Sequence, residues 1–94
     1  MSDTSSTALQ LQSAIELLQQ GKIQQARNSF QHLCSLAPNV THAWFGLAYA
    51  CSHLNDFVAS ISAIEKVLEK EPKNVKALIF KADQLVYNSK SEAL

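Results

Sequence analysis

Residues 38–72 read PNVTHAWFGLAYACSHLNDFVASISAIEKVLEKEP, a stretch that begins with Pro38 and ends with Pro72. These are the two prolines of the chain, and their sequence numbers differ by 34. Between them, the polar pair Asn55-Asp56 separates two segments rich in apolar residues. The second segment carries apolar residues at steps of three and four, at Phe57, Ile61, Ile64 and Leu68. This spacing is typical of an amphipathic helix, and the distance between the prolines equals the length of one common kind of helix–turn–helix repeat.

The same pattern recurs when the chain is slid along itself by this repeat length. Apolar or small residues then coincide, although few are identical: Ala14 with Ala48, Leu17 with Cys51, Ile23 with Phe57, Phe30 with Ile64 and Leu33 with Val67. The polar breaks coincide as well, at Gly21-Lys22, Asn55-Asp56 and Ser89-Lys90. We therefore predict five helices, at about residues 7–20, 23–36, 41–54, 57–70 and 75–88. The connections are only two to four residues long, so neighbouring helices should be antiparallel.

Short polar side chains stand where several of these helices begin. Asn39 or Thr41 is placed to cap the third helix, Asp56 the fourth and Asn74 the fifth. A side-chain oxygen at this position accepts a hydrogen bond from a free backbone N–H of the first turn. Each proline follows the end of a helix, where its missing N–H costs nothing.

The composition bounds the class of protein. Of 94 residues, 47% are hydrophobic and 17% are charged, which favours one folded domain over a disordered chain. Eight basic residues balance eight acidic ones, whereas nucleic-acid-binding proteins carry an excess of positive charge. No apolar run is long enough to span a membrane, and residues 1–6 lack the basic and apolar regions of a signal peptide. We expect a cytoplasmic protein that binds no nucleic acid and does not insert into membranes.

No residue pattern indicates catalysis, a cofactor or a metal site. Cys34 and Cys51 fall on apolar helix faces without Cys-x-x-Cys spacing, so we expect two buried free thiols. His42 and His53 lie about three helical turns apart, too far along one helix to share a metal ion, and His32 stands apart from both. We therefore expect no enzyme activity, no cofactor and no metal.

The second unit, residues 41–74, resembles the tetratricopeptide repeat. The family pattern places Trp, Leu-Gly, Tyr, Ala, Phe, Ala and Pro at fixed spacings. The residues that carry the resemblance are Trp44, Leu47-Ala48, Cys51, Asn55-Asp56-Phe57, Ser60, Ile64, Val67 and Pro72. Ala48 replaces Gly, Cys51 replaces Tyr and Ser60 replaces Ala, and these side chains are all small or medium in size. The first unit has Gln10 and Ser13 in the Trp and Leu positions, and the third has Lys81 in the Leu position.

The resemblance implies an all-α fold in which antiparallel helix pairs stack as a short right-handed superhelix. It divides the chain into a flexible N-terminus (residues 1–6), a first repeat (7–40), a second repeat (41–74) and the first helix of an incomplete third repeat (75–94). This last helix would either cap the stack of repeats or mark where the third repeat is truncated.

In this family the first helix of each repeat lines a concave surface that binds peptides. The corresponding groove candidates are Leu11, Ile15, His42, Phe45, Tyr49, His53, Lys76, Ile79, Asp83 and Tyr87. The alternative is that neighbouring repeats or another subunit cover this face. Some family members clamp a C-terminal carboxylate with Lys, Asn and Arg, but here only Lys76 fits, so we do not expect a clamp.

The resemblance favours a non-enzymatic interaction or scaffold module that binds a protein segment through the concave face. One alternative is the N-terminal part of a larger protein, because residues 76–83 resemble stretches that precede hydroxylase-like or sulfotransferase-like domains. The other is self-association through the fifth helix, since apolar groups surround most of it. The candidates for that contact, in a homo-oligomer, are Ile79, Phe80, Val86 and Tyr87.

Overall fold

The computed structural model of the chain describes residues 3–93, with side chains from Ser6 to Ser91. It contains five helices, namely α1 (Asp3–Gln19), α2 (Ile23–Leu36), α3 (Thr41–His53), α4 (Phe57–Lys70) and α5 (Val75–Ala93). No strand occurs within residues 3–93. The predicted all-α fold is therefore confirmed.

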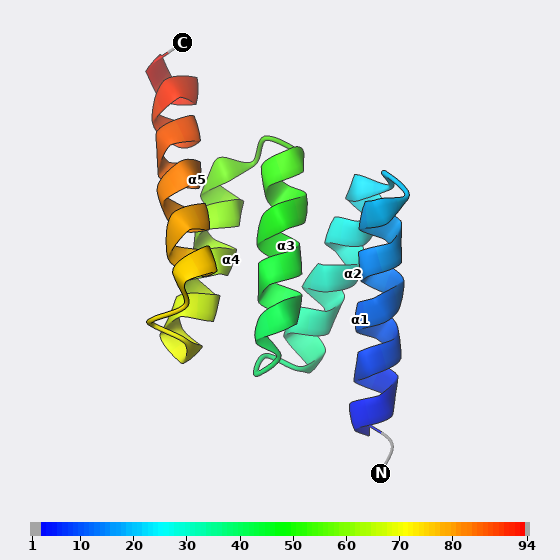
Figure 1. Cartoon of the computed structure of the whole chain (residues 1–94). Helices are drawn as coiled ribbons and strands as arrows, with labels where there is room; N and C mark the ends of the chain where they lie inside the picture. The colour runs from blue at the N-terminus through cyan, green and yellow to red at the C-terminus, as the bar shows by residue number, and fades with distance from the viewer. Residues whose placement is uncertain (1–2, 94) are drawn as a thin grey trace.

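The helices form two layers (Figure 1). Helices α1, α3 and α5 lie side by side in one layer, and α2 and α4 lie behind them. Each helix packs against the next along the chain, and α1 also contacts α3. The molecule measures 49 × 30 × 18 Å. None of the helices described combines the length and the hydropathy needed to span a membrane.

The turns inside the first two helix pairs share one backbone conformation. Gly21 and Asn55, which occupy equivalent positions of the two repeats, both have positive φ angles, of 80° and 61°. This left-handed conformation suits Gly and, less well, Asn. The third break was predicted at Ser89, but α5 continues through it to Ala93. Serine does not favour the conformation that turns the chain at the other two positions.

Helix α1 also extends beyond its predicted bounds. It begins at Asp3, so residues 3–6, which we expected to be part of a flexible N-terminus, are helical. Residues 1–2 lie outside the described part of the chain. No Gly or Pro interrupts residues 3–19, and a helix that has already formed adds further residues at little cost.

Two of the three predicted helix caps are confirmed. Asp56 Oδ1 accepts a hydrogen bond of 3.2 Å from the backbone N–H of Ala59, at the start of α4. Asn74 Oδ1 accepts one of 3.0 Å from the N–H of Ala77, at the start of α5. Both bonds occupy donors that would otherwise have no partner within the helix.

The predicted cap of α3 is wrong. Val40 is the N-cap residue and supplies no side-chain acceptor. Asn39 Oδ1 instead accepts a hydrogen bond of 2.9 Å from Lys70 Nζ, and the hydroxyl of Thr41 donates one of 3.1 Å to Glu71 Oε2. Both candidate caps are thus used to tie the start of α3 to the end of α4.

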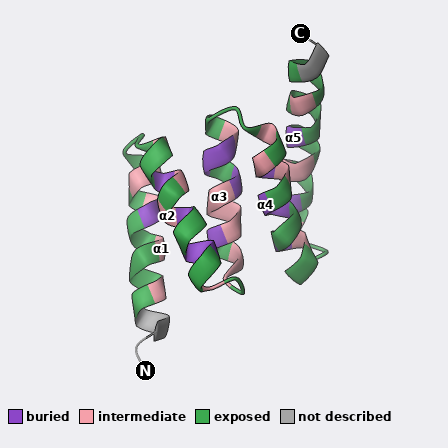
Figure 2. Ribbon diagram, turned by 180° about the vertical axis from the view of Figure 1, so that it is seen from behind, coloured by how far each residue is buried: buried purple, intermediate pink, exposed green. Residues whose placement is uncertain are grey.

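Small residues allow the helices of each pair to approach closely. Ala14, Ala26 and Ala48 are completely buried, as is the larger Phe30 between them in the first pair. In the second pair, the buried hydroxyl of Ser60 donates a 2.7 Å hydrogen bond to the carbonyl oxygen of Ala48. Figure 2 shows that buried positions lie on the facing surfaces of the helices, while the outer helices α1 and α5 are largely exposed.

Trp44 connects the two pairs. Its half-buried side chain packs against a cluster around Leu33 and Cys34 of α2, and against a cluster around Ile64 of α4. The indole N–H also donates a 2.8 Å hydrogen bond to the carbonyl oxygen of Pro38 in the loop between α2 and α3. A single side chain thus links the first helix pair, the loop and the second pair.

Candidate functional site

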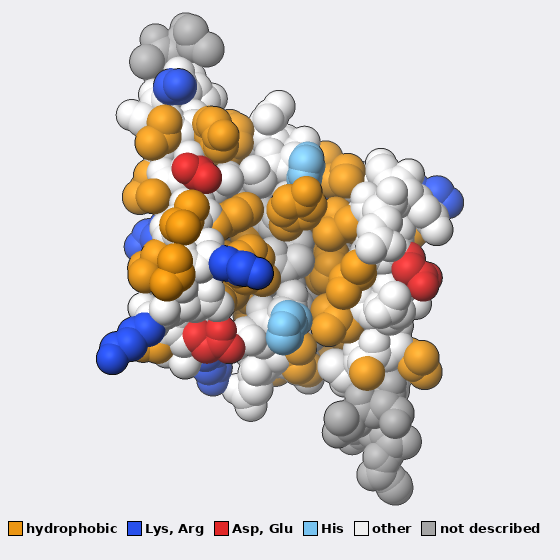
Figure 3. Space-filling view, in the orientation of Figure 1, with side chains coloured by type: hydrophobic (Ala, Val, Ile, Leu, Met, Phe, Trp, Pro, Cys, Tyr) orange, Lys and Arg blue, Asp and Glu red, His pale blue; other side chains and the backbone are white. Residues whose placement is uncertain are grey.

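The predicted groove residues lie on the layer formed by α1, α3 and α5, which we call the α1–α3–α5 face. Figure 3 looks onto this face, with two histidines over α3 and apolar side chains gathered over α5 and between α1 and α3. On α3, the exposed His42 and His53 flank Tyr49, whose side chain is 46% exposed. The rings of Tyr49 and His53 meet edge to face, with centroids 4.5 Å apart. This helix therefore presents a row of accessible rings.

Phe45 lies deeper than the rest of that row. It is half-buried, and its ring meets Phe80 of α5 edge to face at a centroid distance of 5.7 Å. Both rings pack against the buried cluster that contains Ile64 and Val67. Phe45 and Phe80 thus hold α5 against α3, and they contribute to the fold as well as to the surface.

The predicted groove residues of α1 are also part of the packing. Leu11 and Ile15 are half-buried and contact the cluster of Ala14, Ala26 and Phe30. They leave less surface free than Tyr49 does, because α1 uses them to dock on its neighbours. Their role as groove residues remains a proposal.

On α5, the predicted groove residues divide into two groups. Lys76, Ile79 and Asp83 are exposed. The ring centroids of Tyr87 and of Phe57, at the start of α4, lie 5.7 Å apart, and the two ring planes are tilted by 37° to each other. One side of the Tyr87 ring is therefore covered. Of these predicted groove residues of α5, Tyr87 is therefore the one that takes part in an aromatic contact.

The self-association candidates differ in exposure. Ile79, Val86 and Tyr87 are each about half exposed or more, whereas Phe80 is half-buried against Phe45. Placing Phe80 on the exposed surface of α5 was therefore wrong, because its position on the helix turns it towards α3.

The two cysteines are free and buried, as predicted. Burial raises the pKa of the Cys34 thiol to about 12. Burial also raises the pKa of Cys51, and nearby Asp56 adds to that effect while Arg27 opposes it. Both thiols are therefore protonated near neutral pH, which is the unreactive form. Within residues 3–93, no three His, Cys, Asp or Glu residues gather closely enough to hold a metal ion.

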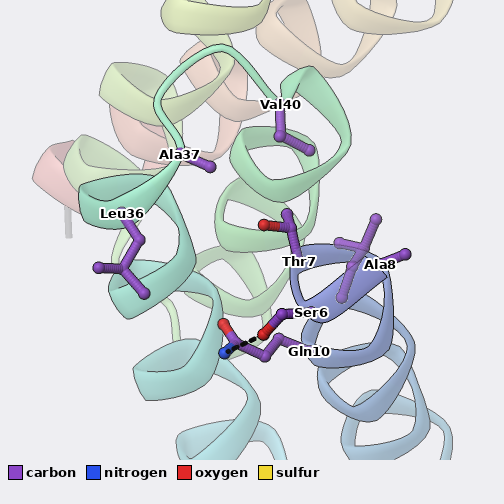
Figure 4. Close-up of a pocket in the computed structure, with 8 residues that line it drawn as sticks. Ser6, Thr7, Ala8, Gln10, Leu36, Ala37 and Val40 are labelled. Carbon is purple, nitrogen blue, oxygen red and sulfur yellow. Dashed lines mark hydrogen bonds between the residues drawn. The ribbon is translucent and has the colours of Figure 1, made fainter. Parts of the chain in front are cut away.

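A cavity of about 650 Å³ lies between the start of α1 and the end of α2 (Figure 4). Ser6, Thr7, Ala8, Gln10 and Leu11 line it from α1, and Leu36, Ala37 and Val40 from the end of α2 and the following loop. This cavity was not among the sites predicted from the sequence. The available signal was Gln10 in the position that Trp44 occupies in the second unit, since replacing an indole by a smaller side chain leaves space.

Comparison with known proteins agrees with the helix pairs and their period. A family model described as Tetratricopeptide repeat matches residues 17–83. No curated protein sequence matches the chain. The matched region takes in the last three residues of α1 and all of α2, α3 and α4, and it reaches into α5. The chain therefore belongs to the tetratricopeptide repeat family.

Proposed function

We propose that this protein is a non-enzymatic interaction module that binds a segment of a protein partner on the α1–α3–α5 face. The observation that supports this most strongly is the accessible row of His42, Tyr49 and His53 on the central helix of that face. A row of rings that the fold does not need for packing suits an interface, where aromatic side chains often contribute most of the binding energy. The family as a whole points to protein partners.

The chemistry of the face suggests the kind of segment bound. Its exposed charges include Lys76 and Asp83, of opposite sign, and the remaining predicted groove residues are apolar, aromatic or His. Such a surface favours a segment with apolar or aromatic side chains over one that is strongly charged. We further infer that the chain acts in the cytoplasm, where two free thiols remain reduced.

Replacing Tyr49 and His53 by Ala should abolish capture of the partner and leave the fold intact. Both side chains are exposed, so the helix content and Tm should remain close to those of the unchanged protein. Loss of an aromatic anchor of this kind costs about 2 kcal/mol or more, which weakens binding by about 30-fold. Partner capture from a cell lysate, followed by titration of the purified partner, measures the change.

Two controls separate this face from the rest of the surface. Val58→Ala changes a residue of α4 that is 63% exposed, and it should leave binding unchanged. Phe45→Ala should weaken binding but also lower Tm, because it removes the contact with Phe80. If the variant with Ala at Tyr49 and His53 bound the partner as tightly as the unchanged protein does, the binding site would lie on another face.

Self-association through α5 is a second candidate function, favoured by a specific observation. Six large apolar residues of this helix are 47–65% exposed, namely Val75, Leu78, Ile79, Leu85, Val86 and Tyr87. On α3, the counterpart of Leu78 is Trp44 and that of Leu85 is Cys51, and both are packed against neighbouring helices. An exposed apolar surface of this size marks a contact with another molecule.

If α5 mediates a dimer, the mass in solution should rise from 10.3 kDa towards twice that value with increasing concentration. Replacing Ile79 and Val86 by Asp should then restore the monomer, because each change places a charge in the apolar contact. Phe80 is kept in these variants because it stabilises the fold. Sedimentation equilibrium measures the mass, and a constant 10.3 kDa across the series would reject self-association.

A further inference from the structure

The cavity between α1 and α2 has a counterpart in the second repeat. Five of its lining residues, Thr7, Ala8, Leu11, Ala37 and Val40, correspond after a shift of one repeat to Thr41, His42, Phe45, Glu71 and Asn74. Those five residues, with Val67, line a space of only about 40 Å³. The same place in the fold is thus nearly filled in the second repeat and open, at about 650 Å³, in the first.

A polar bridge closes the second repeat at this place. Glu71 accepts a hydrogen bond of 3.1 Å from the hydroxyl of Thr41 and one of 2.8 Å from the side-chain amide of Asn74. The first repeat has Ala37 and Val40 in place of Glu71 and Asn74. Neither of these side chains can form a hydrogen bond, so nothing equivalent joins α1 to the loop after α2.

The first repeat also lacks an aromatic ring at the position of Trp44. Trp44 packs between α2 of the first repeat and α4 of the second, whereas Gln10 stands in the same position of the first repeat. The Gln10 side chain reaches only as far as Ser6, with 3.5 Å between its Nε2 and the hydroxyl oxygen. Gln10 lines both the cavity of about 650 Å³ and a second one of about 240 Å³. Open space therefore lies on both sides of the residue that replaces the indole.

We propose that the cavity of about 650 Å³ between α1 and α2, called the cleft from here on, binds a tryptophan side chain of a protein partner. Its walls, formed by Leu11, Leu36, Ala37 and Val40, are apolar, and none of its lining residues is charged. Its polar edge consists of the hydroxyls of Ser6 and Thr7 and the amide of Gln10, which can accept a hydrogen bond from an indole N–H. Its volume lies within the usual range of binding sites.

A second copy of this chain does not supply that ring. The protein has one tryptophan, Trp44, and its indole is packed between helices and hydrogen-bonded to Pro38. The inference rests on the proposed function only in that the occupant belongs to a protein partner. The cleft and the ring row on α3 are different surfaces, and they can be tested separately.

The direct test is a titration with N-acetyl-tryptophanamide, followed through the backbone amide signals of the ¹⁵N-labelled protein. We expect saturable shifts confined to residues 6–11 and 36–40, with a dissociation constant of about 0.1–10 mM, as suits so small a ligand. N-acetyl-lysinamide should cause no saturable shift, since the cleft has no group to pair with its charge. Absence of saturable shifts with the tryptophan compound would overturn the proposal.

Matched variants then locate the binding. Leu36→Ser removes one wall of the cleft, and Val58→Ser changes an equally exposed residue elsewhere, the two side chains being 61% and 63% exposed. We expect the first to abolish the shifts and the second to preserve them. Persistence of the shifts in Leu36→Ser would overturn the assignment. Shifts of residues 6–11 and 36–40 on raising the protein concentration alone would identify a second copy as the occupant and would also overturn it.

Gln10→Trp tests the origin of the cleft. An indole at this position should occupy part of the cleft that Gln10 lines, so that Tm rises by about 4 °C or more and the probe no longer binds. Continued binding of the probe to the folded variant would contradict the proposal. The variant with Ala at Tyr49 and His53 should bind the probe normally, so failure of the proposed function and failure of this inference give different results.

Discussion

Trp44→Ala is expected to lower the free energy of unfolding by about 3 kcal/mol, near the lower end for Trp truncation because the side chain is only half-buried. The indole contacts clusters on both sides of α3, and its N–H bonds the carbonyl oxygen of Pro38 at 2.8 Å. Truncation therefore opens space between the two helix pairs and leaves that carbonyl without its partner. For a domain of this size, such a loss lowers Tm by about 12 °C or more.

Thermal unfolding followed by circular dichroism measures this effect, and the third repeat offers a matched control. Leu78 stands one repeat after Trp44, in the same position of α5, but is about half exposed. Leu78→Ala should therefore cost less than about 1 kcal/mol. If Trp44→Ala and Leu78→Ala shifted Tm equally, Trp44 would not be the link between the pairs.

Gly46→Ala is expected to destabilise the protein by about 1–3 kcal/mol, although Ala favours helices more than Gly does. A Cβ atom at this position would lie 2.5 Å from Cζ and 2.6 Å from Cδ1 of Phe30. Phe30 is completely buried, so its ring cannot move aside without disturbing the packing of α1 on α2. Helix propensity alone predicts the opposite sign, a gain of about 1 kcal/mol, which makes the direction of the change decisive.

A double-mutant cycle isolates the contact. Phe30→Leu removes the ring, so Gly46→Ala should cost less in that background than in the unchanged protein. Urea unfolding of the four proteins gives the coupling energy. A stabilising Gly46→Ala, or effects that simply add, would show that α2 and α3 are not in close contact at this point.

The positions of the helices could be predicted because residues that end helices or turn the chain recur at the repeat length. Pro38 and Pro72 mark the ends of two units, and Gly21 and Asn55 mark the turns inside them. Helices α2, α3 and α4 lie between these residues and match their predicted bounds to within one residue. The outer ends of α1 and α5 could not be fixed in the same way, since no Gly or Pro limits either.

The surface was less predictable, because it depends on contacts between units. The spacing on α3 placed Phe45 in one row with Tyr49 and His53, but α5 covers Phe45 through Phe80. Asn39 is a good cap by residue type, yet its side-chain oxygen accepts a hydrogen bond from Lys70 of α4 instead. Contacts of this kind join residues that lie roughly one repeat apart in the sequence, and the periodicity of a single helix carries no information about them.

The cavity between α1 and α2 depends on differences between repeats rather than on the pattern that they share. Ala37 and Val40 replace the hydrogen-bonded Glu71 and Asn74 of the second repeat, and Gln10 replaces Trp44, whose indole packs between the two helix pairs. In the sequence, such replacements stand out only as departures from the repeat pattern. In the folded protein, these replacements together leave an open, uncharged cleft in the first repeat.

Site-specific photo-crosslinking tests most directly whether partners bind on the α1–α3–α5 face. The photoreactive residue p-benzoylphenylalanine would replace Tyr49 on this face in one protein and Val58 of α4 in another; the two native side chains are 46% and 63% exposed. Irradiation in a lysate, followed by mass spectrometry, identifies what each position touches. Binding through this face predicts a discrete crosslinked partner from position 49 and none from position 58. The same partner crosslinked from position 58 and not from position 49 would contradict it.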